Sequence, residues 1–184
     1  MCAAHKSPAA AGIALAVVVL AGCAPDLAPA ARQVAVSPSA AVAWMNGFCG
    51  AVKDFIDGNN QMPSASGETV EAVKKSTSDQ LGHYAEILAK TVDGLGALPA
   101  APVPAGDAAK QEFLAKYTAA RDKTVKAKAG LDAAGKNDTA AQSRAVEGLI
   151  AAQKDTHSAL DPVAAVRSAP ELKTAAATAE RCRP

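Results

Sequence analysis

Apolar residues recur every three or four positions through most of this sequence, and that spacing constrains its fold more than any other feature. They do so over four long segments, at about residues 39–57, 66–95, 107–134 and 138–160. Such a spacing places apolar side chains on one face of an α-helix. After residue 38 we find no apolar–polar alternation of the kind that a half-buried strand shows. The sequence therefore predicts an all-α fold, an antiparallel bundle of four main helices with a short C-terminal helix.

Proline and small polar residues predict where these helices begin and end. The connection over residues 96–106 contains three prolines, which prevent a helix there. Asp107 follows this connection and is predicted to cap the third helix. Pro162 ends or kinks the fourth helix, and the stretch from Ser168 to Glu171 has the pattern of a capping box that begins the last helix.

The same spacing predicts which residues face the core. Trp44, Phe48 and Phe55 widen the apolar stripe of the first helix, so we expect this helix near the centre of the bundle. In the second helix the predicted stripe is Val70, Val73, Thr77, Leu81, Tyr84, Leu88 and Thr91. In the third helix it is Phe113, Leu114, Tyr117, Ala120, Val125 and Leu131. In the fourth helix it is Val146, Ile150, Gln153, His157 and Leu160.

The start of the chain has the organisation of a secretory signal. Lys6 supplies a positive charge, and the following run from Ala9 to Gly22 is uncharged, largely apolar and 14 residues long. A membrane-spanning helix needs about 20 residues, so this run is too short to remain as an anchor. It ends in Leu20-Ala21-Gly22-Cys23, which resembles the lipobox of bacterial lipoprotein precursors.

In that family the cysteine receives a diacylglyceryl group and the precursor is cut just before it. The resemblance therefore implies cleavage between Gly22 and Cys23, and lipidation of Cys23. Two acyl chains anchor a protein stably without a membrane-spanning helix. We expect a signal peptide over residues 1–22, a lipidated cysteine with a disordered Ala/Pro tether over 23–38, and a helical domain over 39–184. The domain would lie on the extracytoplasmic face of the cell membrane, and the high alanine and proline content favours an actinobacterial source.

Two further cysteines predict a covalent cross-link in the exported domain. Aromatic residues make up only 3% of the chain and alanine dominates its helices, so the hydrophobic stabilisation of the core is modest. Cys49 and Cys182 each fall on the apolar face of their own helix. In an exported protein such a pair predicts a disulfide. Two free thiols, or pairing between chains, are the alternatives.

Charge and motifs exclude several classes of function. Residues 1–22 contain Lys6 and no acidic residue, so the remaining chain has 18 basic residues (19 − 1) and 18 acidic ones. Such a chain has no overall attraction for nucleic acid. The sequence contains no haem-attachment motif, phosphate-binding loop, nucleophile elbow or His-Glu-x-x-His pair. We therefore expect no catalytic residue, no metal and no cofactor.

The third helix nevertheless carries a local excess of basic residues. They are Lys110, Lys116, Arg121, Lys123, Lys126 and Lys128. We interpret them as a solvated helix face, with contact to anionic lipid or to a partner as the alternative.

The expected function is that of a non-catalytic lipoprotein that binds or braces another envelope protein through an exposed helical face. The alternative is a small-ligand carrier with a pocket inside the bundle, lined by Trp44, Phe48, Phe55 and Tyr84. A cavity of about 300 Å³ or more between the helices would favour the carrier. A third hypothesis is a metal site that His83 and His157 would form if their helices face each other.

Overall fold

The computed structural model describes residues 37–64 and 66–183, which belong to one compact unit, Ala35–Pro184. Its elements are α1 (Pro38–Asn60), α2 (Val70–Gly96), α3 (Pro104–Ala133), α4 (Thr139–His157), α5 (Pro162–Ala165), α6 (Pro170–Thr178) and the 3₁₀ turn η1 (Glu180–Cys182). The predicted all-α fold is confirmed, because these residues contain helices and no strand. The cleavage and lipidation site at Gly22 and Cys23 lies outside the described residues.

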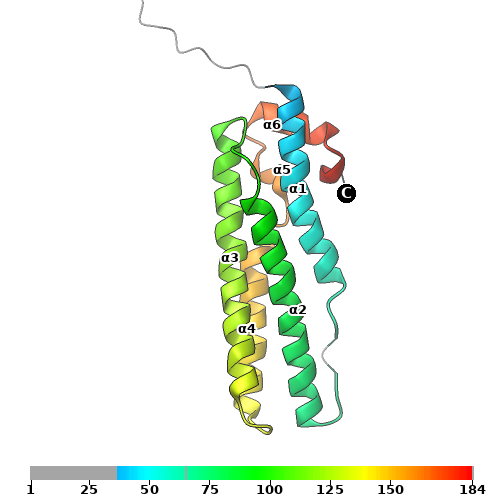
Figure 1. The fold of residues 1–184 in the computed structure, drawn as a ribbon, viewed down its shortest axis with the longest axis vertical. Coiled ribbons are helices and arrows are strands. Elements are labelled where there is room, and N and C mark those ends of the chain that lie inside the picture. The colour runs from blue at the N-terminus through cyan, green and yellow to red at the C-terminus, as the bar shows by residue number, and fades with distance from the viewer. Residues whose placement is uncertain (1–36, 65, 184) are drawn as a thin grey trace, which may run out of the picture. The chain divides into compact units, whose positions relative to one another are not determined.

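The long helices alternate in direction, and α3 packs against two of them. Figure 1 shows α2 and α4 running in one direction and α3 running antiparallel to both. α3 packs along both neighbours, whereas α2 and α4 touch each other at few places. α1 packs on α2, and α6 and η1 pack on α1 at the end of the bundle where α1 begins (Figure 1). We call this end the upper half, and the end with the α3–α4 turn the lower half.

Aromatic rings from α1 and α3 fill the interior of the upper half. The ring centroid of Phe48 lies 5.0 Å from that of Trp44 and 5.0 Å from that of Phe113. The ring of Phe55 lies 4.9 Å from Tyr117 in an edge-on contact. All five residues are 3% exposed or less. The expectation that the first helix lies near the centre of the core is therefore correct for its aromatic face.

Side-chain caps begin several helices, but two of the predicted starts are wrong. Asp138 accepts a hydrogen bond from the backbone N–H of Ala141 at 2.8 Å and so caps α4. Asp107, however, lies inside α3, which begins at Pro104. Proline suits this first position because a backbone N–H there would have no carbonyl partner within the helix. The Asp107 carboxylate instead accepts the N–H of Ala101 at 2.9 Å. The predicted capping box from Ser168 to Glu171 is also wrong, since the N-cap of α6 is Ala169 and no side chain caps the helix.

The predicted core face of α4 is wrong by about one position. Val146 and Ile150 are 45% and 59% exposed, and Gln153 and His157 are exposed as well. The buried residues are Ala141, Ala145, Leu149, Ala152 and Thr156. Small side chains face α3 because the two helices approach closely.

A similar shift occurs on α3. Val125 is 51% exposed, and Thr124 is buried in its place. The Thr124 hydroxyl donates to the Ala120 carbonyl at 2.8 Å, which satisfies the polar group inside the core. The apolar spacing therefore predicts burial of the more hydrophobic Val125, whereas the structure buries Thr124.

Two glycines test the close α3–α4 approach. A Cβ at Gly148 would lie 2.6 Å from Cβ of Ala127, whereas a Cβ at Gly130 would meet nothing within 4 Å. We expect Gly148→Ala to lower the free energy of unfolding by about 1–2 kcal/mol, because the overpacking outweighs the gain in helix propensity. The matched Gly130→Ala should raise it by about 0.5–1 kcal/mol. Urea unfolding measures both changes, and shifts in the same direction would contradict the close packing.

Candidate functional site

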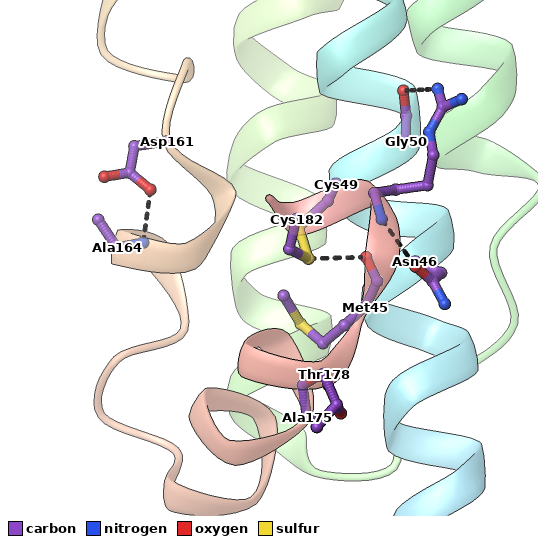
Figure 2. Close-up of a disulfide and its surroundings, with 10 residues drawn as sticks. Met45, Asn46, Cys49, Gly50, Asp161, Ala164, Ala175, Thr178 and Cys182 are labelled. Carbon is purple, nitrogen blue, oxygen red and sulfur yellow. Dashed lines mark hydrogen bonds between the residues drawn. A yellow bond between two sulfur atoms is a disulfide. The ribbon is translucent and has the colours of Figure 1, made fainter. Parts of the chain in front are cut away.

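A disulfide and one arginine fix the C-terminal end of the domain to α1. Cys49 of α1 and Cys182 of η1 are joined, with Cα atoms 5.0 Å apart and a sequence separation of 133 (Figure 2). The guanidinium of Arg181 donates to the carbonyl of Gly50 at 3.2 Å and also pairs with Asp54. The structure thus contains the cross-link that the sequence predicts. It holds η1 against the middle of α1 and closes the upper half of the bundle.

The four aromatic residues proposed as pocket lining are packed in the core rather than arranged around an opening. Trp44 donates its indole N–H to the Pro99 carbonyl at 3.2 Å, and its ring packs on Phe48. Phe55 and Tyr84 also border a cavity of 270 Å³ between α1, α2 and α4. This volume is below the lower end of the range typical of ligand pockets. The ligand pocket that the carrier hypothesis places among these four residues is therefore not formed.

Two tyrosine hydroxyls are buried where α2 and α3 meet the end of α4. The hydroxyl of Tyr84 lies 3.1 Å from that of Thr156, and Tyr117 donates to the Ala159 carbonyl at 2.9 Å. Both tyrosines are 0% exposed. Burial raises the pKa of both hydroxyls above the ordinary value of 10.0, and the Asp155 carboxylate raises the pKa of Tyr84 further.

These raised pKa values predict a loss of stability in alkaline solution. The folded state keeps protons that the unfolded chain releases, so this contribution is complete below about pH 10 and is lost as the pH rises further. Tyr117→Phe should reduce the slope of this loss by up to about 1.4 kcal/mol per pH unit. Urea unfolding between about pH 8 and pH 11 measures the slope. Equal slopes for the two proteins would contradict the assignment to Tyr117.

The lower half of the bundle lacks the helix that α1 supplies in the upper half. Gly47 of α1 faces Leu98, just after the end of α2. Gly58 faces Ile87 and its carbonyl contacts His83, so α1 covers α2 from about His83 onward. Residues 61–64 and 66–69 then follow the lower part of α2 without forming a helix. In this half the described helices are α2, α3 and α4 (Figure 1).

An open groove, which we call the α2–α4 seam, marks the missing helix. It has a volume of 460 Å³ and is lined by Val73, Thr77, Thr139, Gln142, Ser143, Val146 and Glu147. Val70 lies at its end, where its carbonyl accepts a hydrogen bond from Gln142 at 3.1 Å. Ile150 follows Val146 by one helical turn. Of the four large hydrophobic side chains that are exposed in the described residues, Val146 lines the seam, and Val70 and Ile150 lie next to it along α2 and α4.

No family model, no curated protein and no solved structure matches this chain. The geometry of the described residues therefore carries the functional argument.

The two histidines that were candidates for a metal site lie in different surroundings. His83 places Nε2 3.0 Å from the Gly58 carbonyl oxygen at the end of α1. His157 is exposed, so its predicted place on the buried stripe is wrong. In the part of the chain that the structure describes, no group of three His, Cys, Asp or Glu side chains is placed to hold a metal ion. Nor is any helix of that part both long and apolar enough to cross a membrane.

The residues of the α2–α4 seam were not identified as a site from the sequence. The sequence predicts Val146 and Ile150 in the core, because their spacing fits a buried stripe. The lengths of the predicted helices do indicate such a site. The first helix, 39–57, is shorter than the second, 66–95, and a shorter helix leaves part of a longer one uncovered.

Proposed function

We propose that this chain is a membrane-anchored extracytoplasmic lipoprotein without catalytic activity, which binds another protein of the cell envelope through the α2–α4 seam. The observation that carries the binding role is the group of exposed apolar side chains, Val70, Val146 and Ile150, at the position of the missing helix. Exposed apolar groups that gather around a groove are typical of interaction sites.

The shape of the seam favours a helix as its occupant. In the upper half, α1 lies along α2, and its Gly58 faces the buried Ile87. A partner helix in the lower half would continue this arrangement. It would present apolar residues at intervals of three and four to Val146 and Ile150, which is the helix-in-groove mode of recognition.

The lipobox supports the membrane anchor, and Cys23→Ala tests it. The altered chain has no thiol to acylate, so it should either keep its leader or leave the membrane fraction. Cell fractionation with immunoblotting measures both outcomes. A Cys23→Ala chain of mature size that still sediments with membranes would contradict the anchor but not the partner seam.

Cross-linking in living cells tests the seam. A photoreactive benzoylphenylalanine at Val146 should give one defined cross-linked species. The matched control is the same substitution at Val125, which is as exposed (51% against 45%) but lies on α3 outside the seam. Adding Ile150→Glu should abolish the cross-link from position 146, because a carboxylate cannot enter an apolar contact without a desolvation cost.

The outcomes separate specific from general contact. Equal cross-linking from positions 125 and 146, or none from position 146, would exclude the seam as the partner site. Ile150 is 59% exposed, so Ile150→Glu should leave the melting temperature unchanged. A loss of cross-linking then reports on the partner rather than on the fold.

A further inference from the structure

A second groove runs along the contact between α3 and α4, and it shares no lining residue with the α2–α4 seam. Its volume is 360 Å³, within the range of small-ligand sites. The floor is made of Ala127, Gly130, Leu131, Ala141, Ala145, Gly148 and Ala151. From Ala141 to Ala151 this floor extends for about 15 Å along α4.

The floor is smooth and carries no polar side chain. Its alanines and glycines project little from the helix surfaces, so they do not form the deep holes that receive the side chains of a docking helix. A continuous, narrow apolar surface of this kind fits an unbranched hydrocarbon chain, which has no backbone polar groups to satisfy.

The rim of the groove is basic on both helices. Lys123 and Lys126 come from α3, Arg144 comes from α4, and no acidic residue lines the groove. Lys123 is paired with Asp155 at 2.6 Å. Among the described residues Lys126 has no carboxylate oxygen within 4.0 Å, and the nearest one to Arg144, on Asp138, is 4.0 Å away.

This free positive charge distinguishes the groove from the rest of α3. Lys116, Arg121 and Lys128 pair with neighbouring carboxylates at 2.5–2.9 Å. Lys110 is buried and donates to the carbonyls of Leu98 and Pro99. The local basic excess of the third helix therefore remains unneutralised mainly at the rim of this groove.

We propose that the α3–α4 groove binds a single-chain lipid with an anionic head, namely a fatty acid of medium length. The hydrocarbon tail lies along the alanine and glycine floor. The carboxylate is held at the rim by Lys126 and Arg144, whose charges it neutralises. The proposal does not depend on the partner seam.

Calorimetric titration with dodecanoate tests the proposal. The protein is the chain from residue 23 onward with Cys23→Ala, which needs no detergent and retains all of the compact unit. We expect one site with a dissociation constant on the order of 10–100 µM. Gly130→Leu should weaken binding by at least about tenfold, because its side chain enters open space on the floor. Lys126→Ala should weaken binding about tenfold through loss of the ionic contact.

Matched controls make each outcome decisive. Gly96→Leu adds the same side chain at a position with equally open space, on α2 and outside the groove, and should bind dodecanoate as the unsubstituted chain does. If Gly130→Leu does not fold, Ala151→Leu replaces it in the test, because it fills the other end of the floor. Unchanged binding after filling would overturn the site. Equal binding of dodecyltrimethylammonium would overturn the role of the basic rim. Binding of an acidic helical peptide but not of dodecanoate would replace the lipid with a protein ligand.

Discussion

Replacing Cys49 and Cys182 with alanine is expected to lower the free energy of unfolding by about 4–5 kcal/mol. The disulfide spans 133 residues of sequence, so its removal greatly increases the freedom of the unfolded chain. For a domain of this size the loss corresponds to a fall in melting temperature on the order of 10–20 °C. Thermal unfolding followed by circular dichroism measures it.

Two controls isolate the cross-link from the contacts around it. Reductant should destabilise the unsubstituted protein to a similar extent and should have no effect on the double variant. Arg181→Ala removes an ion pair whose partners are 44% and 70% exposed, so it should cost less than about 1 kcal/mol. A double variant that unfolds at the original temperature would show that packing alone holds η1 on α1.

Phe48→Ala is expected to cost about 3–5 kcal/mol, the second largest effect. Phe48 is 0% exposed, and its ring lies 5.0 Å from both Trp44 and Phe113. The substitution removes a large apolar area and leaves a cavity between α1 and α3 that the alanine-rich surroundings cannot fill. Urea unfolding gives the change in free energy.

Ile150→Ala is the matched control for Phe48→Ala. Ile150 is a large apolar residue on a helix, but it is 59% exposed, so truncation should change the free energy of unfolding by less than about 0.5 kcal/mol. A cost near that of Phe48→Ala would mean that Ile150 is buried in solution. The α2–α4 seam would then be covered in the free protein.

Helix number and the disulfide were predictable because they depend on local pattern. Proline and glycine separate the helical segments, and the spacing of apolar residues gives their type. The pairing of Cys49 with Cys182 is confirmed, although only Cys49 lies on the buried face of a helix. Cys182 lies in the turn η1, because α6 ends at Thr178 and does not extend to it as predicted. The start of α2 was placed too early, since the N-cap is Thr69 rather than a residue near Ser66.

The facing of α4 and the location of the seam were not predictable from pattern alone. On α4, both the large residues Val146 and Ile150 and the small residues Ala145 and Ala152 recur at helical spacing. Which set is buried depends on how closely α3 approaches, and that is set by the contact of Gly148 with Ala127. The location of the seam follows from the position of α1 along α2. That position is a long-range property, so it cannot be read from any one segment of the sequence.

The link between α1 and η1 also determines what a protease can release. Every residue from 50 to 181 lies inside the ring that Cys49 and Cys182 close. A single cut anywhere in that range, including the non-helical stretch after α1, leaves both fragments covalently joined. A domain held at its N-terminal side would therefore stay on the cell surface after one such nick, and shedding would require either a second cut or reduction.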